Sequence, residues 1–229
     1  MTDGRTALIT GGTGGLGAAT VAAFVAEGWR VVTPVRPGSA ERLPKGAVAV
    51  DGDMTVETDV TAAVAAATAD PEASLRAVVN LIGGFASGPL VAETPWSDFE
   101  AQLRLNLRPT YLVTAAALPA LVEAGGGSIV CVSSRTALAP FPGAAGYATS
   151  KAAVIAFANA VAVEYRKRNV RCNTVVPSVI DTDANRAAMP DADPARWVRP
   201  EQIARTILFL ASDASVSTSG AQIPVYGQA

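Results

Sequence analysis

Histidine is absent from the 229-residue chain. A Ser-His-Asp or Cys-His nucleophile is therefore excluded, and so is any metal ion held by histidine. Proton transfer must instead use tyrosine, lysine, cysteine, a carboxylate or water. We expect no metal site in this protein.

Cysteine is scarce, since only Cys131 and Cys172 are present. Both lie in apolar segments with the character of strands. Two buried free thiols in a reducing cytosol are favoured over a structural disulfide.

Charged residues make up only 17% of the chain, and the formal net charge is −2. There is no basic excess to bind nucleic acid or an anionic membrane. Every apolar stretch near the length of a membrane span is interrupted by polar residues, glycine or proline, so no transmembrane helix is expected. Residues 1–5 lack the features of a signal peptide, and we expect a cytoplasmic location.

Half of the residues are hydrophobic, which allows a large core. Short apolar runs alternate with longer helical patterns, which predicts βαβ crossovers. We therefore expect residues 1–229 to form one α/β domain, a doubly wound parallel sheet of about seven strands with helices on both faces. The expected strands are 6–10, 29–34, 47–51, 76–82, 128–132, 170–176 and 221–225, and the expected helices are 15–28, 56–69, 95–124 with a break near Asn106, 147–167 and 200–211.

The least regular stretch is 177–199, which is polar and contains three prolines. It begins beyond the carboxyl end of an expected strand, where open α/β sheets bind their ligands. This stretch is therefore a candidate lid or substrate loop.

A glycine-rich loop follows the first expected strand, with the sequence Thr-Gly-Gly-Thr-Gly-Gly-Leu-Gly over residues 10–17. Glycine permits a tight turn and lets the backbone approach a pyrophosphate, and the following helix offers free N–H groups to its phosphates. A purely structural turn is the alternative. The candidate cofactor-binding residues are Gly11, Thr13, Gly14, Gly15 and Leu16.

The spacing Thr-Gly-x3-Gly-x-Gly resembles the short-chain dehydrogenase/reductase family, and the resemblance extends over essentially the whole chain. The other residues that carry it are Asp53, Asn80, Gly83, Asn106, Ser134, Tyr147, Lys151 and the segment 177–182. It implies a Rossmann-type enzyme that uses a nicotinamide dinucleotide on a small carbonyl or alcohol substrate. It also implies a homodimer or homotetramer formed through the long helices near 107–124 and 148–167.

The residues that distinguish NAD from NADP are expected at the end of the second strand. An acid there binds the ribose of NAD, whereas a cation accommodates the 2′-phosphate of NADP. The segment 32–37 has no acid and contains Arg36, while the Thr13 hydroxyl could add a contact. NADP is therefore favoured and NAD remains possible, the alternative being that Arg36 is a solvated surface charge.

The resemblance implies further cofactor contacts. Asp53 and Met54 would flank the adenine, although Asp53 could instead cap the helix expected from residue 56. Asn80 lies near the end of the fourth expected strand and Gly83 directly follows it. Both would contact the cofactor, and Gly83 would allow the backbone to approach the adenosine ribose.

After the sixth expected strand, the resemblance places the nicotinamide carboxamide against Pro177, the backbone of Ile180 and the hydroxyl of Thr182.

Tyr147 and Lys151 are four residues apart at the start of a helix, so they share one helical face. The ammonium group of Lys151 is expected to lower the pKa of the Tyr147 phenol, which could then act as an acid or a base. Lys151 is also expected to contact the ribose of the cofactor. The resemblance selects Ser134, thirteen residues upstream, over Ser133 as the residue that holds the substrate oxygen. The resemblance also implies that Asn106 kinks its helix and binds a water molecule that takes part in a proton relay. The alternative is that Asn106 simply breaks the helix.

The substrate is less well defined. Residues 181–193 and Trp197 are similar to the corresponding loop of dihydropteridine reductases, which makes a pterin the alternative to a general ketone, aldehyde or alcohol. Trp96, Phe141 and Trp197 could line an apolar pocket or simply pack. A sensor or scaffold that binds dinucleotide without turnover is a further alternative, but such proteins typically lose the tyrosine or the lysine.

Overall fold

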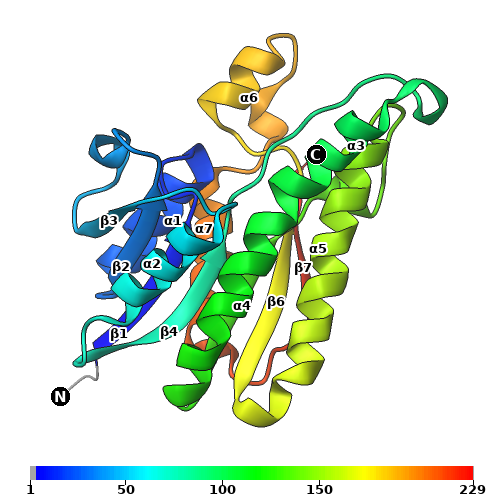
Figure 1. Cartoon of the computed structure of the whole chain (residues 1–229). Coiled ribbons are helices and arrows are strands. Elements are labelled where there is room, and N and C mark those ends of the chain that lie inside the picture. Colours follow the sequence, from blue (N-terminus) through cyan, green and yellow to red (C-terminus); the bar gives the residue numbers. More distant parts are fainter. Residues whose placement is uncertain (1–3, 229) are drawn as a thin grey trace.

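A seven-stranded parallel sheet with the order β3-β2-β1-β4-β5-β6-β7 organises the molecule (Figure 1). The computed structural model describes residues 4–228. The prediction that residues 1–5 lack the features of a signal peptide therefore falls mostly outside the described residues. The strands are β1 (Gly4–Thr10), β2 (Arg30–Val35), β3 (Ala47–Asp51), β4 (Ala73–Asn80), β5 (Gly127–Val132), β6 (Val170–Pro177) and β7 (Gln222–Val225). The predicted doubly wound, Rossmann-type parallel sheet is confirmed.

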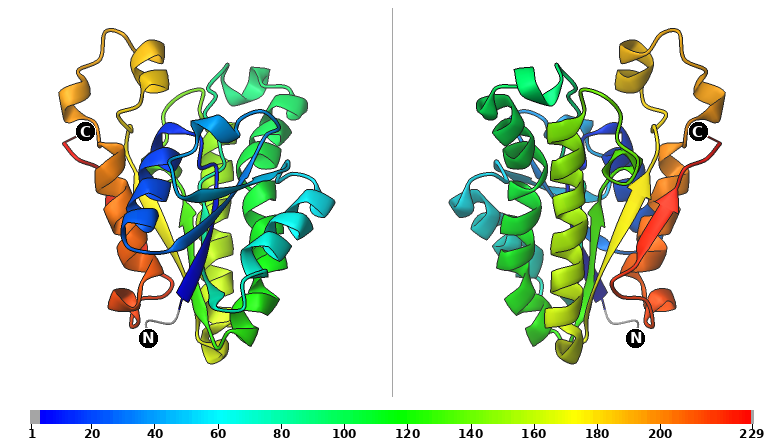
Figure 2. Two further views of the ribbon diagram at one scale, coloured as in Figure 1. Left: turned by 90° about the vertical axis from the view of Figure 1, so that its left-hand side faces the viewer. Right: turned by 90° about the vertical axis from the view of Figure 1, so that its right-hand side faces the viewer.

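Helices cover both faces of this sheet (Figure 2). They are α1 (Gly15–Ala26), α2 (Glu57–Thr68), α3 (Trp96–Asn106), α4 (Arg108–Glu123), α5 (Ala145–Glu164), α6 (Asp183–Ala188) and α7 (Pro200–Ala211). On one face, α1 and α7 pack together, and on the other lie α2, α4 and α5. The short helix α6 projects beyond the carboxyl ends of the strands (Figure 1).

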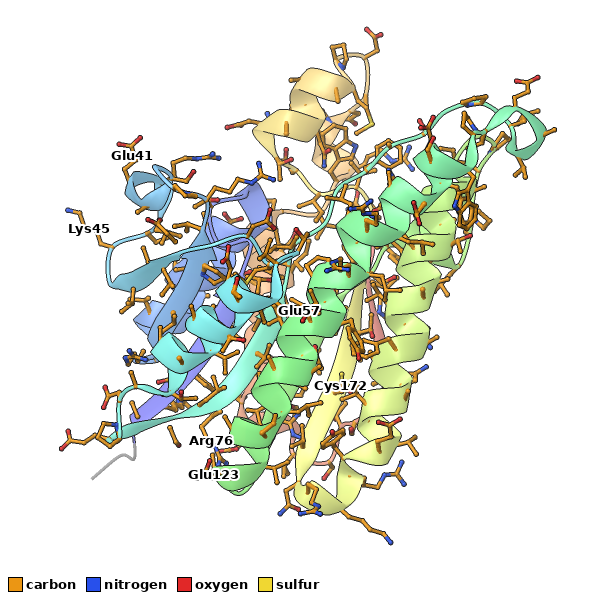
Figure 3. All side chains as sticks on the ribbon, in the orientation of Figure 1. Glu41, Lys45, Glu57, Arg76, Glu123 and Cys172 are labelled. Carbon is orange, nitrogen blue, oxygen red and sulfur yellow. The ribbon has the colours of Figure 1, made fainter. Side chains whose placement is uncertain are left out.

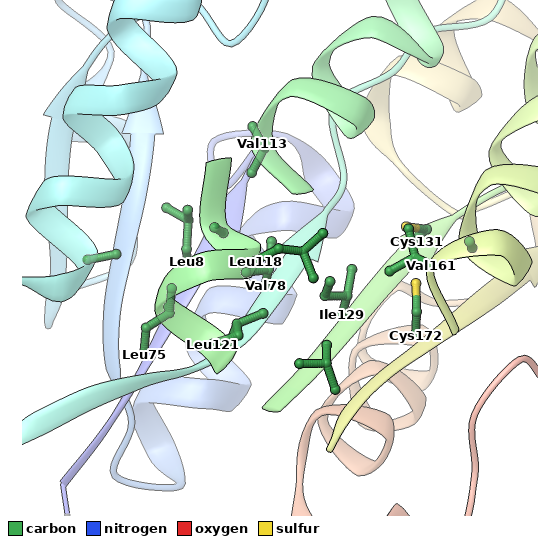
Figure 4. Close-up of a cluster of buried hydrophobic side chains, with 14 of the residues drawn as sticks. Leu8, Leu75, Val78, Val113, Leu118, Leu121, Ile129, Cys131, Val161 and Cys172 are labelled. Atoms are coloured by element: carbon green, nitrogen blue, oxygen red, sulfur yellow. The ribbon is translucent and has the colours of Figure 1, made fainter. Parts of the chain in front are cut away.

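Each face has its own apolar core. Phe24 of α1 and Ile207 of α7 are fully buried in one core. The other core contains Val113, Cys131 and Cys172 (Figure 4). Both cysteines are free and buried, as the sequence predicts.

Helix α5 is long and apolar enough to cross a membrane by length and composition alone, which the interrupted sequence pattern did not lead us to expect. However, its inward-facing residues Val154, Ala158 and Val161 are almost fully buried in the core beside the sheet. The apolar character of α5 is explained by this packing.

Three arginines at the amino edge of the sheet bind the carboxyl ends of helices. Arg30 donates to the Ala66 carbonyl at 3.1 Å near the end of α2, and Arg76 donates to the Ala124 carbonyl at 2.5 Å after α4 (Figure 3). Arg171 donates to the carbonyls of Leu210, Ser212 and Thr218 around the end of α7. A cation at a helix carboxyl end satisfies free carbonyls and opposes the negative end of the helix dipole.

The element boundaries differ from expectation in a few places. Strand β4 begins and ends earlier than predicted, because Leu81 and Ile82 continue the apolar pattern beyond the last paired residue. The expected irregular stretch 177–199 contains α6. The predicted break near Asn106 is present, since α3 ends there and α4 begins two residues later.

Candidate active site

The glycine loop joins β1 to α1 at the carboxyl edge of the sheet. Gly11 has a φ of +73°, and a Cβ at this position would lie 3.2 Å from the amide nitrogen of Ile82. A Cβ at Gly17 would collide with the carbonyl of Gly11. Within residues 4–228, no side chain caps the amino end of α1, so its first amides are available to an anion. The loop therefore fits a pyrophosphate.

The segment after β6 returns to this loop. Thr182 lies so close to Gly15 that a Cβ on Gly15 would be 2.6 Å from the Thr182 methyl group. The hydroxyl of Thr182 accepts from the Asn185 amide at 3.2 Å and caps α6. The Ile180 carbonyl accepts from the Asn185 side chain at 2.8 Å. Of the predicted carboxamide contacts, Thr182 thus lies beside the glycine loop. Ile180 is bonded to the same segment through Asn185, and Pro177 ends β6.

The two candidate serines after β5 have different surroundings. The Ser134 side chain acts on the Tyr147 phenol, whose pKa it lowers, and its hydroxyl accepts from the Thr136 amide at 3.2 Å. The Ser133 hydroxyl is buried and donates to the Lys151 carbonyl at 2.8 Å. Ser134 therefore faces the reacting group, while Ser133 fixes the backbone of α5.

Lys151 is almost fully buried under the loop that follows β4. Its ammonium group donates to the Val132 carbonyl at 3.1 Å. A Cβ at Gly83 would lie 2.9 Å from this ammonium nitrogen and 2.6 Å from Oδ1 of Asn106. Any larger residue at this position would displace one or both side chains, which is a physical reason for glycine at position 83.

Asn106 lies at the break between α3 and α4, and its side-chain amide is fully used. Its oxygen accepts from the Gly84 amide at 3.0 Å, and its nitrogen donates to the Gln102 carbonyl and to the Ser150 hydroxyl, each at 3.1 Å. Ser150 in turn donates to the Tyr147 carbonyl at 2.8 Å. The sequence reasoning missed Ser150, because serine within a helix carries no distinctive signal.

The electrostatics correct one expectation. Burial raises the pKa of Tyr147, against the opposing effect of the hydrogen bond from Ser134. The predicted lowering of the Tyr147 pKa by Lys151 is wrong for the protein alone, since the ammonium group is directed at the Val132 carbonyl. Burial also lowers the pKa of Lys151 to about 8.

Arg36 is exposed immediately after β2, at the carboxyl edge where the sequence places it. Its positive charge contributes to the lowered pKa of Asp53, whose main cause is the hydrogen bond from the Thr55 backbone. Arg42, which the sequence reasoning missed, donates to the Thr13 carbonyl at 3.1 Å. Arg42 thus contacts the glycine loop, and it could not be found from spacing because it lies in the connection between β2 and β3, outside the motif.

Asp53 does not cap α2, because its carboxylate accepts from the amide and hydroxyl of Thr55, both at 2.8 Å, and α2 begins at Glu57. The side chain of Met54 is buried in the core beside α2. The Asn80 side chain is also buried and donates to the Thr114 hydroxyl of α4 at 3.0 Å. The side chains of these two predicted cofactor residues are therefore buried in the protein, and the Oδ1 atom of Asn80 has no hydrogen-bond partner among the described residues.

The three aromatic residues proposed for a pocket lie in different places. Trp197 is buried near the end of the stretch 177–199, and Trp96 is exposed and stacks on Phe99 with ring centroids 5.6 Å apart. Phe141 is near Phe85, an aromatic residue that the sequence reasoning passed over. Phe85 contacts Tyr147 edge to face, with centroids 5.0 Å apart.

Comparison with known proteins agrees with this geometry. The family model described as short chain dehydrogenase matches residues 5–193. The 2-(R)-hydroxypropyl-CoM dehydrogenase of Xanthobacter autotrophicus is 32% identical over 246 residues, with 97% of each chain covered. The 3-oxoacyl-(acyl-carrier-protein) reductase of Thermotoga maritima is 30% identical, covering 98% of this chain and 97% of that protein.

Among solved structures, a short-chain type dehydrogenase/reductase from Mycobacterium ulcerans is similar, with a TM-score of 0.90 and 30% identity. The similarity covers 98% of this chain and 89% of that chain. Because the family model and these relatives span most of the sequence, the chain belongs to the short-chain dehydrogenase family of oxidoreductases.

Proposed function

We propose that this chain is an NADP-preferring dehydrogenase/reductase that interconverts a small carbonyl compound and its alcohol, with Tyr147 as the acid and base. The observation that carries this proposal is that the Ser134 side chain acts on the Tyr147 phenol, which lies one helical turn from the buried Lys151. The whole chain, residues 1–229, would act as one cytoplasmic domain, in keeping with its two free thiols.

Each residue of the site has a distinct task in this proposal. Ser134 holds the substrate oxygen, and Tyr147 donates its phenolic proton to that oxygen during reduction or removes it during oxidation. A raised pKa keeps Tyr147 protonated near neutral pH, which suits it to donate. The nicotinamide, when bound, supplies or accepts the hydride.

Lys151 would contact the cofactor ribose, and Asn106 would support the proton relay by fixing Lys151 and Tyr147. Two observations support this role. The side chains of Asn106 and Lys151 both lie close to Gly83, and Asn106 donates a hydrogen bond to Ser150. Asn106 is thus proposed to position the reacting groups.

The glycine loop supports dinucleotide binding, since a Cβ at Gly17 would collide with the Gly11 carbonyl and one at Gly15 would lie 2.6 Å from the Thr182 methyl group, so glycine keeps the turn tight. We propose that Gly11, Thr13, Gly14, Gly15 and Leu16 hold the pyrophosphate and that the edge formed by Asp53, Met54, Asn80 and Gly83 receives the adenosine. Pro177, Ile180 and Thr182 would receive the carboxamide. The exposed Arg36, with no acid on segment 32–37, favours the 2′-phosphate of NADP.

The exposed faces of α4 and α5 support a further part of the proposal, a homodimer or homotetramer. Tyr111 of α4 is 53% exposed and Val163 of α5 is 68% exposed, so apolar surface remains outside the core. Sedimentation analysis would test the assembly.

The decisive experiment is a panel of ketones and aldehydes, including quinonoid dihydropterin, with NADPH and NADH in separate reactions. We expect substrate-dependent oxidation of NADPH, abolished by Tyr147→Phe. Cofactor binding without turnover of any substrate would support a sensor or scaffold instead, and turnover of the pterin alone would support a dihydropteridine reductase.

A further inference from the structure

Apolar side chains are exposed on the two loops that follow β4 and β5. Phe85 is 59% exposed, Leu138 is 54% exposed and Phe141 is 46% exposed. Because β4 and β5 are neighbouring parallel strands, both loops leave the sheet at the edge that carries Tyr147. Apolar surface beside a reacting group is characteristic of a ligand site.

The two loops are bonded to each other. The Gly88 amide donates to the Gly143 carbonyl at 3.0 Å. Gly143 has a φ of +82°, and a Cβ there would collide with the Gly88 carbonyl. The backbones of the loops that carry Phe85 and Phe141 are therefore in close contact, and this contact fixes the position of one loop relative to the other.

The aromatic rings form a row that begins at the reacting phenol. Phe85 and Tyr147 are edge to face at 86°, with centroids 5.0 Å apart. Phe85 and Phe141 are tilted by 42°, with centroids 6.2 Å apart. These contacts orient the Phe85 ring, yet more than half of its surface stays in water.

The chemistry of this surface limits what it can bind. Phe85, Leu138 and Phe141 offer no hydrogen bond, so the hydroxyl groups of a polyol would lose water without gaining a partner. A flat ring would cover the exposed surface and add edge or face contacts. The neighbouring cation Arg135 lies over the Tyr226 ring, 5.2 Å from its centroid.

We propose that Phe85 and Phe141 select a neutral ketone or alcohol with an aromatic ring next to the reacting carbon. The ring of the substrate packs against Phe85 while its oxygen meets Tyr147 and Ser134. Phe85 is the specificity-determining residue. This inference rests on the proposed function of the same site and adds the substrate class.

The kinetic test compares acetophenone, acetone, dihydroxyacetone and benzoylformate as substrates for NADPH-dependent reduction. In the unaltered enzyme, kcat/KM for acetophenone is expected to exceed that for acetone by at least about tenfold. Phe85→Leu should lower this ratio by about tenfold, because the ring of acetophenone loses its aromatic partner whereas acetone has no ring to lose one. Phe209→Leu, which alters an aromatic residue of α7 that is 47% exposed, is the matched control and should leave the ratio unchanged.

A binding measurement separates this inference from the proposed function. Benzyl alcohol is titrated calorimetrically into the enzyme with NADPH bound, a mixture in which no reaction can occur. Its dissociation constant should rise at least about fivefold in Phe85→Leu and stay unchanged in Phe209→Leu.

Equal binding by Phe85→Leu, no binding by the unaltered enzyme, or a preference for acetone, dihydroxyacetone or benzoylformate would overturn the aromatic substrate class. Failure to reduce any ketone would instead overturn the proposed function, and the titration would still decide whether Phe85 binds a ring.

Discussion

The side-chain amide of Asn106 donates to the Ser150 hydroxyl at 3.1 Å. This hydrogen bond connects α5 to the point at which α3 ends and α4 begins. Ser150 passes the connection to the Tyr147 carbonyl, and Asn106 also accepts from Gly84. A helix break, a glycine turn and the helix that carries Tyr147 are therefore fixed by one buried side chain.

Replacement of Asn106 tests this connection. Asn106→Ala removes the acceptor of the Gly84 amide and the donor to the Ser150 hydroxyl, so we expect a loss of about 2–4 kcal/mol in the free energy of unfolding. Urea denaturation measures the loss, and kcat should fall by more than cofactor affinity. Asn159→Ala, on the partly exposed side of α5, is the control; a similar loss there would contradict the assignment.

Replacement of Tyr147 tests the proton transfer. Tyr147→Phe removes the hydroxyl and preserves the ring, so the cofactor should bind as before while kcat falls by on the order of a thousandfold. Fluorescence titration and steady-state rates measure the two effects. Tyr165→Phe, at the other end of α5, should retain full activity, and substantial turnover by Tyr147→Phe would refute the mechanism.

The buried ammonium group of Lys151 predicts a pH-dependent stability. Its pKa of about 8 lies below the ordinary 10.5, so the unfolded chain holds more protons between these values and stability rises with pH across that window. At neutral pH the buried charge opposes folding by about 3 kcal/mol. Lys151→Met should therefore unfold at a higher temperature at pH 7, with the difference shrinking towards pH 10.5.

The same substitution should weaken cofactor binding and lower turnover, because the proposed ribose contact is lost. Lys45→Met, at an exposed lysine, is the control for both measurements (Figure 3). A Lys151→Met protein that is less stable at pH 7, or that binds NADPH normally, would be inconsistent with this account.

Replacement of Arg36 tests cofactor preference. Arg36→Ala should raise the dissociation constant of NADPH by about tenfold or more, since a charge-assisted bond to a phosphate is lost, and change that of NADH by less than twofold. Lys45→Ala on the same connection between β2 and β3 is the matched control. An equal effect on both cofactors would show that Arg36 does not read the 2′-phosphate.

Replacement of Arg171 tests the opposite edge of the sheet. Arg171→Met removes bonds to the carbonyls at the end of α7, and we expect a loss of about 2–3 kcal/mol in unfolding free energy with kcat unchanged. Arg168→Met, at an exposed position nearby, should change neither quantity. A fall in kcat without a fall in stability would contradict a purely structural role.

The sequence predicted the sheet well because βαβ alternation is a strong local pattern. Helix α7 was predicted at its observed bounds, since Pro200 suits a first helical position and the apolar residues recur at helical spacing. Helix α6 has only six residues and escaped prediction because so short a segment shows little periodicity.

The site was predicted less completely, because its contacts join distant segments. Tyr147 and Lys151 are neighbours on one helix and could be paired from spacing. Ser150, Arg42 and Phe85 gain their importance only when folding brings other loops against them. The pKa of Tyr147 was predicted in the wrong direction, since neither its burial nor the orientation of Lys151 is visible in the sequence.

The arginines at the amino edge have a consequence for folding kinetics. Arg30, Arg76 and Arg171 reach helix ends that are 36, 48 and 39 positions away in the chain. Contacts between such distant residues form late and slowly, because a long loop must close before they contribute. The helix ends are therefore expected to become protected from hydrogen exchange together with the strands, so that an intermediate with finished helices and an unfinished sheet should not accumulate.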